Sequence, residues 1–224
     1  MDGKERAARS AIAEVRSGQV LGLGTGSTAM RALQALAERI RDESLDVVGV
    51  PTSLATQREA ARLGIPLTTL GEHTQLDLAF DGADQVDPNL VAIKGYGGAL
   101  LREKIVASCA RRVLIMVDDS KLAEMLDLAV PVEVLPFALG VARKRLANLG
   151  GVPKLRLEGG EPYVTDNGNP ILDVDFGAIA EPAELGGRIA AVPGVVGHGL
   201  FIDLIDELHI GSAESGRVVR KARG

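Results

Sequence analysis

The chain has no tryptophan, only 3% aromatic residues, a single cysteine and no block of basic residues interleaved with aromatic ones. The core must therefore be aliphatic, built from valine, leucine, isoleucine and alanine. A net charge of −5 without a basic block argues against a nucleic-acid partner. The lone cysteine, Cys109, excludes a disulfide framework and fits a reducing compartment. Its place in an apolar helical register predicts a buried, inert thiol.

Long uninterrupted apolar runs are also missing. The stretch 1–15 is charged and lacks the apolar segment of a secretory signal. The most apolar stretch, 126–142, is interrupted by Asp127, Glu133 and two prolines, so it does not predict a membrane span. These absences predict a soluble cytoplasmic protein without a membrane partner.

What the chain does contain is an alternation of short apolar runs and longer amphipathic ones over its first two thirds. The short runs predict strands at 19–24, 46–50, 76–80 and 112–117. The longer runs predict helices at 29–40, 53–64 and 99–110. This order predicts an α/β fold with a mostly parallel sheet and helices on both of its faces.

The pattern changes near Val130. Further strands are expected at 130–135, 153–158, 169–176 and 195–201, with helices at 137–150 and 182–192. This arrangement predicts a smaller α+β domain near the C-terminus, and the stretch 206–221 could return a strand to the first sheet. The expected domains are therefore 1–129 with 202–224, and 130–201.

A glycine loop, "GLGTGSTA" at 22–29, follows the first expected strand and opens a helix. The free N–H groups and the dipole of a helix N-terminus favour an anion, and Thr25, Ser27 and Thr28 add three hydroxyl groups. The dinucleotide fingerprint fits poorly, because the second strand ends without the carboxylate that binds a ribose hydroxyl. The Walker pattern lacks its lysine. The loop favours the phosphate of a small molecule over a glycine-lined packing turn.

Two aspartates follow the third expected strand, in "FDGAD" at 80–84. Ligands of open parallel sheets bind beyond the carboxyl ends of the strands, so Asp81 and Asp84 are expected at the same edge as the glycine loop. Taken alone, the pattern also fits a turn in which Asp84 caps a helix. A Mg²⁺ site is a rival, but the only further acid close by is Asp87 and no histidine is near.

The stretch "KGYGGALLREKI", 94–105, has more glycine than a helix start requires, and charges on both sides of it. One face of the expected helix is marked by Leu101, Ile105, Ser108 and Cys109. Glu103 points away from that face, toward a cleft or solvent. Lys94 and backbone N–H groups can stabilise an oxyanion, and a carboxylate beside them can take a proton from carbon. The stretch predicts chemistry through an enediolate.

Seven short motifs follow one another along the chain, and their combined order identifies a protein family far more specifically than any single motif does. They are "GLGTGSTA" (22–29), "DGAD" (81–84), "KGYGGALLREKI" (94–105), "DDSK" (118–121), "PVEVLP" (131–136), "TDNGNPILD" (165–173) and "PGVVGHGLF" (193–201). With these motifs the chain resembles the ribose-5-phosphate isomerases of the A type over nearly its whole length.

The resemblance implies an aldose–ketose isomerase that interconverts D-ribose 5-phosphate and D-ribulose 5-phosphate in the non-oxidative pentose phosphate pathway. Neither a metal nor an organic cofactor is implied. The implied fold is a Rossmann-like domain with a small α+β domain. The implied assembly is a homodimer or a homotetramer.

By motif, the resemblance makes Glu103 the base that moves a proton between C2 and C1, Asp81 an aid to ring opening, and Lys94 the stabiliser of the enediolate. Asp84 would bind sugar hydroxyls. Further substrate contacts are implied for Thr25, Gly26, Ser27, Thr28, Gly82, Ala83, Gly95, Tyr96, Gly97 and Lys121. Lys4 is an additional phosphate candidate whose flanking residues match the family poorly.

Tyr96 departs from the family pattern, because it interrupts the glycine run after Lys94. Gly95, Gly97 and Gly98 can still supply any positive φ that the turn needs. We therefore expect a negative φ at Tyr96, with its ring against the mouth of the site or at a subunit contact. The alternative is an exposed ring without a role.

Two other functions remain as alternatives. A non-catalytic sugar-phosphate sensor would keep the phosphate loop and need no base, but it would usually carry a DNA-binding segment, and none is visible. A coenzyme A transferase would need a nucleophilic glutamate and a coenzyme site, for which no motif is visible. Formation of a ketose from ribose 5-phosphate discriminates the isomerase from both.

Overall fold

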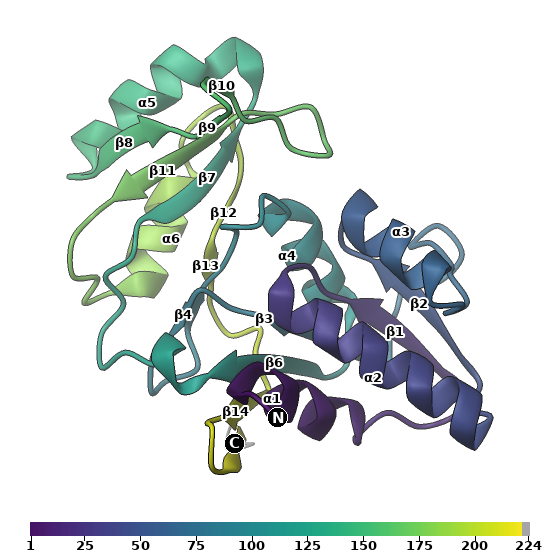
Figure 1. Ribbon diagram of the computed structural model, residues 1–224. Coiled ribbons are helices and arrows are strands. Elements are labelled where there is room, and N and C mark those ends of the chain that lie inside the picture. Colours follow the sequence, from purple (N-terminus) through teal and green to yellow (C-terminus); the bar gives the residue numbers. More distant parts are fainter. Residues whose placement is uncertain (221–224) are drawn as a thin grey trace. The chain divides into compact units, whose positions relative to one another are not determined.

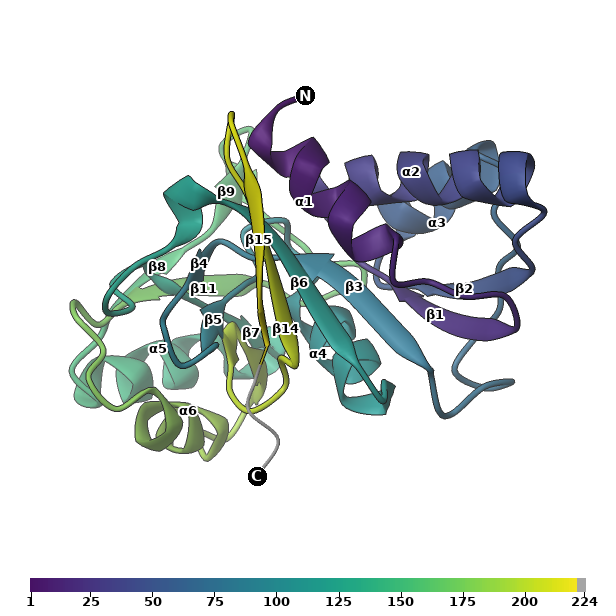
Figure 2. The ribbon, with the colours of Figure 1, turned by 90° about the horizontal axis from the view of Figure 1, so that it is seen from below.

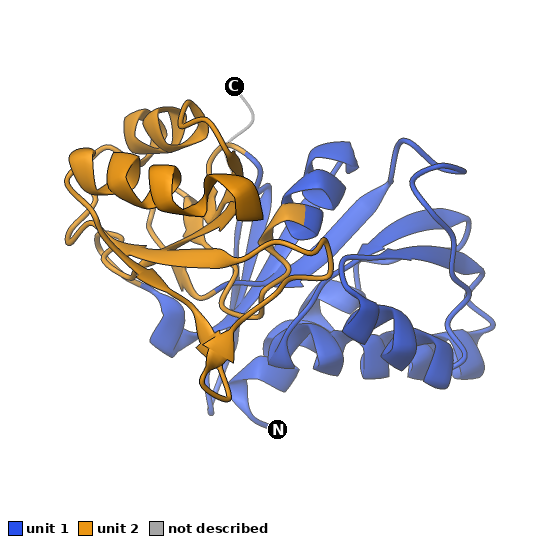
Figure 3. Ribbon diagram, turned by 90° about the horizontal axis from the view of Figure 1, so that it is seen from above, with its two compact units in different colours: residues 1–83, 102–122, 204–224 blue, residues 84–101, 123–203 orange. Residues whose placement is uncertain are grey.

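The computed structural model describes residues 1–220, which form two compact units (Figure 3). Unit 1 comprises residues 1–83, 102–122 and the described part of 204–224, and unit 2 comprises 84–101 and 123–203. The expected domain boundaries differ from this division mainly in the segment 84–101. That segment contains β4 (Gln85–Val86) and β5 (Ala92–Ile93), which form a small sheet with β13 (Leu200–Phe201). Residues 221–224 of the expected first domain lie outside the described residues.

Unit 1 is built on a six-stranded sheet in the order β15-β14-β6-β3-β1-β2 (Figure 2). Its strands are β1 (Gln19–Leu23), β2 (Val47–Pro51), β3 (Leu78–Gly82), β6 (Val113–Asp118), β14 (Glu207–Gly211) and β15 (Gly216–Arg220). All neighbouring pairs are parallel except β14 with β15. The mostly parallel sheet is confirmed, as is the return of the C-terminal segment to it.

Helices cover both faces of this sheet. They are α1 (Gly3–Ile12), α2 (Ser27–Glu43), α3 (Leu54–Arg62) and α4 (Leu100–Cys109). Leu21 and Leu23 of β1 join a core cluster with residues of α1, α2 and α3. Gly22 points to the opposite face, where an added Cβ would lie 2.5 Å from Cγ1 of Val106 in α4. Only glycine at position 22 permits α4 to approach the sheet this closely.

The first helix, α1, was not expected from the sequence. It is capped by Asp2, whose carboxylate accepts a hydrogen bond from the backbone N–H of Glu5 at 2.8 Å. Its buried face consists of Ala7, Ala8, Ala11 and Ile12. In Figures 1 and 2, α1 lies beside α2. Small side chains let α1 pack closely on the sheet, but they give a weak hydrophobic pattern in the sequence.

Unit 2 is a smaller α+β unit around the antiparallel sheet β12-β7-β11-β8. Its elements besides the small sheet are β7 (Val130–Val134), α5 (Leu139–Asn148), β8 (Val152–Leu155), β9 (Leu157–Glu158), β10 (Glu161–Pro162), β11 (Ile171–Asp175), α6 (Pro182–Ala190) and β12 (Val195–His198). Val130, Val132 and Val134 alternate along β7 into its core. Among the described residues, no helix combines the length and the hydropathy needed to span a bilayer.

Candidate active site

The glycine loop connects β1 to the N-terminus of α2, which begins at Ser27 after Gly26. Gly26 has a φ of 101°, a backbone conformation that favours glycine. At Gly24, an added Cβ would collide with the carboxylate of Asp81. Both glycines are therefore needed for the conformation of the loop, which leads directly into the N-terminus of a 17-residue helix. Such a terminus suits an anion.

Asp81 ends the buried part of β3 and holds the loop in place. Its Oδ1 atom accepts hydrogen bonds from the backbone N–H groups of Thr25, at 3.0 Å, and Gly82, at 2.8 Å. β3 is the neighbour of β1, so their carboxyl ends share one edge of the sheet. The sequence prediction that Asp81 lies at the same edge of the sheet as the glycine loop is confirmed, whereas Asp84, which was expected at that edge as well, belongs to unit 2.

Beneath the loop lies a cluster of hydroxyl groups that the sequence reasoning missed. The Oγ1 atom of Thr25 lies within hydrogen-bond distance of Thr52 (2.8 Å), Ser53 (2.9 Å) and Thr56 (3.0 Å). Thr56 in turn donates to the carbonyl oxygen of Gly24 at 2.8 Å. The only signal in the sequence was the group of hydroxyl residues in "PTSLAT" after the second strand.

Two lysines of unit 1 are further candidates for contacts to the substrate. The ammonium group of Lys4, on α1, donates to Oγ of Ser27 at 3.1 Å. Lys121 ends a short 3-10 helix, Asp119–Lys121, directly after β6. Because β6 pairs with β3, Lys121 follows a strand end at the same edge of the sheet as Asp81. Lys4, the weaker candidate from the sequence, thus contacts a residue of the candidate phosphate loop.

Asp84 and the glycine-rich segment 94–98 lie in unit 2. The Oδ2 atom of Asp84 accepts the backbone N–H of Tyr96 at 3.0 Å, which joins the "DGAD" motif to the glycine arm, residues 94–98. Lys94 is 3% exposed, and its Nζ atom lies 5.3 Å from the ring centre of Phe201. The backbone N–H of Lys94 donates to Gly199 O at 2.9 Å. The motif "GHGL" therefore supports Lys94.

Glu103 lies in the first turn of α4 and is 4% exposed. The face that the sequence predicts as the apolar side of this helix is wrong. Leu100, Val106 and Ala107 are buried, whereas Ile105 is 43% exposed and Cys109 is only half-buried. The apolar residues of α4 spread around the helix, so their spacing does not identify its buried side. Glu103 belongs to the buried side and does not face open solvent.

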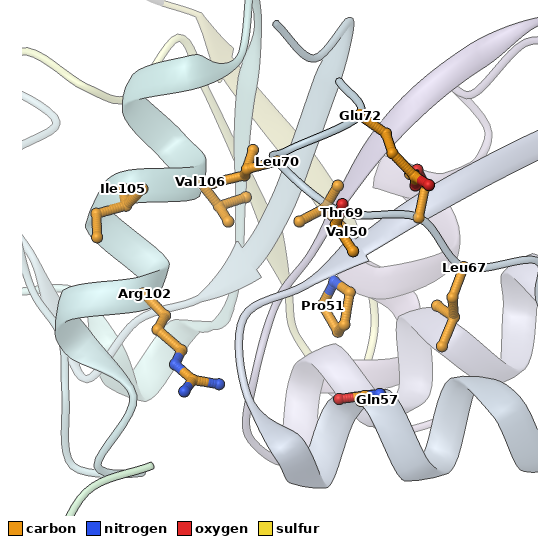
Figure 4. A pocket seen from close by; sticks show the side chains of 11 residues that line it. Val50, Pro51, Gln57, Leu67, Thr69, Leu70, Glu72, Arg102, Ile105 and Val106 are labelled. Carbon is orange, nitrogen blue, oxygen red and sulfur yellow. The ribbon is translucent and has the colours of Figure 1, made fainter. Parts of the chain in front are cut away.

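The residue before Glu103 faces a different environment. Arg102 extends from α4 into a cavity of about 460 Å³ in unit 1 (Figure 4). The cavity is otherwise lined by Val50, Pro51, Gln57, Leu67, Thr68, Thr69, Leu70, Glu72, Ile105 and Val106. Glu103 is not among these residues. Consecutive charged residues of α4 thus have separate surroundings.

Lys104 adds a titratable group to α4. Burial lowers its pKa to about 8 from an ordinary value of 10.5. The folded state therefore binds this proton less readily than the unfolded state does. Burial of the charged Lys104 ammonium group therefore destabilises the folded state, and this destabilisation is fully present below pH 8. The free energy of unfolding should rise between about pH 8 and 10.5, as the folded state loses the proton.

Replacing Lys104 with methionine should remove this rise and increase the free energy of unfolding at pH 7 by about 1–2 kcal/mol. Urea unfolding of both proteins at pH 7 and pH 10 measures the effect. If the free energy of unfolding changed by the same amount between pH 7 and pH 10 in both proteins, the prediction would be contradicted.

The chain crosses between the units inside the motifs themselves. It leaves unit 1 between Ala83 and Asp84 and re-enters it between Leu101 and Arg102. Thr25, Gly26, Ser27, Thr28, Asp81, Gly82, Ala83, Glu103 and Lys121 belong to unit 1, and Asp84, Lys94, Gly95, Tyr96 and Gly97 to unit 2. Among residues 1–220, no three histidine, cysteine, aspartate or glutamate side chains form a group that could hold a metal ion.

Comparisons with known proteins give one consistent result. The family model of ribose 5-phosphate isomerase A (phosphoriboisomerase A) matches residues 48–215. Ribose-5-phosphate isomerase A of Roseiflexus castenholzii is 54% identical over 205 residues, covering 90% of this chain and 88% of the relative. The enzyme of that name from Methanosarcina acetivorans is 48% identical over 213 residues, covering 94% and 91%.

Solved structures agree. Ribose 5-phosphate isomerase A from Methanocaldococcus jannaschii has a TM-score of 0.93 at 40% identity, covering 97% of this chain and 98% of that one. A D-ribose-5-phosphate isomerase in complex with phospho-erythronic acid has a TM-score of 0.94 at 35% identity, covering 99% and 100%.

Proposed function

Since the chain belongs to the ribose 5-phosphate isomerase A family and is an aldose–ketose isomerase of ribose 5-phosphate, we propose that Glu103 is its general base. The observation that carries this proposal is the burial of a carboxylate in the first turn of α4, nine residues after the buried Lys94. A carboxylate shielded from water can take a proton from carbon without exposing the intermediate to solvent.

In the proposed reaction, Glu103 removes the proton from C2 of the open-chain aldose and returns it to C1, which gives the ketose. The electron pair left at C2 moves into the carbonyl group and produces an enediolate. Lys94 supplies the positive charge for the developing oxyanion. Asp81, held by two backbone N–H groups, assists ring opening and proton movement at the sugar oxygens. Asp84 binds sugar hydroxyls.

The substrate phosphate is proposed to bind at the N-terminus of α2, against Ser27 and Thr28. The helix N-terminus, two hydroxyl groups and the ammonium of Lys4 on Ser27 support an anion there. Lys121 is proposed as a further substrate contact. The complex of a solved relative with phospho-erythronic acid supports a phosphorylated, sugar-like ligand.

The test is incubation with ribose 5-phosphate while formation of the ketose is followed, with and without EDTA. We expect turnover that is unchanged by exhaustive chelation, because Lys94 and backbone donors supply the stabilisation a metal would give. Loss of activity that Mg²⁺ or Zn²⁺ restores would reject the metal-free mechanism. Absence of turnover under all conditions would reject the activity.

The phosphate loop gives a separate prediction. Ser27→Ala and Thr28→Ala should raise KM for ribose 5-phosphate roughly ten- to a hundredfold, since a hydrogen bond to a charged group contributes about 1.5–3 kcal/mol. Steady-state kinetics with ribose 5-phosphate and free ribose measure this. Thr74→Ala, at an exposed threonine of unit 1, is the matched control. Equal losses for both sugars would show that the loop does not recognise phosphate.

The assembly and location are further parts of the proposal. We propose a homodimer or homotetramer, which light scattering coupled to size-exclusion chromatography would distinguish from a monomer. The single cysteine favours a reducing compartment, and we propose the cytoplasm.

A further inference from the structure

The glycine arm that carries Lys94 forms a tight turn within unit 2. The N–H of Gly98 donates to the carbonyl oxygen of Gly95 at 3.0 Å, which leaves Tyr96 and Gly97 at the centre of the turn. Gly95 and Gly98 have φ values of 113° and 78°. As predicted, Tyr96 has no positive φ; the described non-glycine residues that have one are Ser44, Leu90 and Asp203. Two glycines thus make the turn possible, but they do not hold it rigid.

One side chain from a distant part of the sequence forms hydrogen bonds with this turn. Arg156 lies between β8 and β9, and its Nη1 atom donates to the carbonyl oxygens of Gly95 at 2.8 Å and Tyr96 at 3.3 Å. Its Nε atom donates to Oδ2 of Asp173 at 2.9 Å, and its Nη2 atom donates to Oδ1 of the same carboxylate. The guanidinium group therefore connects the arm to β11 through a bidentate ion pair.

Two aromatic rings complete the surroundings of Arg156. Its Cζ atom lies 5.9 Å from the ring centre of Tyr96 and 5.8 Å from that of Tyr163. The Tyr96 ring is half-exposed, but its hydroxyl group donates to the carbonyl oxygen of Ala129 at 3.2 Å. The ring is therefore exposed, as in the expected alternative, but it makes contacts within unit 2. Tyr163 packs so closely on Gly98 that an added Cβ there would collide with its hydroxyl group.

The Arg156 side chain is only 13% exposed, and its Nη1 atom donates to backbone atoms of the arm while the rest of the guanidinium group binds Asp173. A lysine at this position would keep the charge, but it would lack the planar fork that bonds a carboxylate and two carbonyl groups together. Lys94 immediately precedes Gly95, whose carbonyl group Arg156 binds. A change in the orientation of the Gly95 peptide therefore moves the residue that carries the ammonium group.

We propose that Arg156 is a positioning residue for the isomerisation. Through the carbonyl groups of Gly95 and Tyr96 it fixes the arm that aligns the Lys94 ammonium group with the developing oxyanion. The Tyr96 ring, at the position that departs from the family's glycine run, covers the guanidinium group and strengthens this contact. The proposal rests on the role proposed above for Lys94.

The test is Arg156→Lys, with Arg145→Lys as the matched control at an exposed arginine of α5. Misplacement of a catalytic group by about 1 Å can lower a rate roughly a hundredfold, so we expect kcat to fall between about ten- and a hundredfold. Binding of inorganic phosphate, which depends on the loop of unit 1, should stay within about twofold of wild type. Binding of phospho-erythronic acid should weaken more than that of phosphate.

A second variant, Asp173→Asn, removes the charged partner of Arg156 without altering the arm. We expect kcat to fall by about three- to tenfold, and its effect should not multiply with that of Arg156→Lys, because both act on one contact. This variant also keeps the proposal testable if Arg156→Lys folds poorly.

Arg156→Lys and Asp173→Asn proteins that turn over like the Arg145→Lys control would overturn the proposal. A parallel loss of inorganic phosphate binding and kcat would also overturn it, since that result indicates general damage to the fold. Failure of the isomerase function itself would appear differently, as absence of turnover in the wild-type protein.

Discussion

Replacing Glu103 with glutamine is expected to lower kcat by at least about 10²-fold, the usual scale for loss of a general base. Glutamine keeps the size of the side chain and its place on the buried side of α4, but it cannot accept the proton from C2. The affinity for ribose 5-phosphate should largely survive, because the phosphate loop is intact. Steady-state kinetics and titration with inorganic phosphate separate the two effects.

The control for this variant is Glu124→Gln, a change of the same chemistry at an exposed glutamate. It should leave kcat within about twofold of wild type, as surface substitutions usually have small effects. If Glu103→Gln retained near-full turnover, another residue would have to be the base. Exchange of the C2 proton with deuterated solvent, measured by NMR, should also disappear in Glu103→Gln.

The second large effect is expected for Lys94→Met, with a loss of about 10²–10³ in kcat, the range found when one donor to an oxyanion is removed. Lys94 is buried beside the Phe201 ring, and methionine keeps most of the length of its apolar stem while it removes the ammonium group. Turnover should collapse, and thermal unfolding measures separately how much the change affects the fold.

Lys154→Met is the matched control, because Lys154 is an exposed lysine of the same unit. A Lys94→Met protein that lost less than about fivefold in kcat would show that backbone donors alone stabilise the enediolate. A large drop in melting temperature would instead assign Lys94 a structural part in unit 2.

The four strands β1, β2, β3 and β6 of the central sheet could be predicted because they are short apolar runs that alternate with longer amphipathic stretches. β1, β3 and β6 are largely buried on both faces, so each appears in the sequence as a nearly continuous apolar run. Residues 25–28 and Asp81 could be placed together for the same reason, since parallel strands bring their carboxyl ends to one edge. That part of the candidate site follows from local patterns and one rule of topology.

The contacts around the arm could not be predicted, because they join residues far apart in the sequence. Arg156 lies 60 positions after Tyr96, at an interruption of the expected strand 153–158. Nothing in the residues near Arg156 indicates that it binds backbone carbonyl groups. The wrong face assigned to α4 has another cause, since the helix is apolar on several sides and its periodicity is weak.

The order of strands in unit 1 has a consequence for folding during synthesis. β14 pairs with β6 and packs against α1, but residues 119–206 separate it from β6 along the chain. Until the ribosome has released residues 207–211, β6 is an apolar edge strand and α1 lacks part of its packing surface. Formation of the complete sheet must therefore wait for nearly the whole chain, and such non-local pairing makes folding slow. A nascent chain stalled before residue 207 exposes β6 as an unpaired, apolar edge strand, which chaperones and other nascent chains can bind.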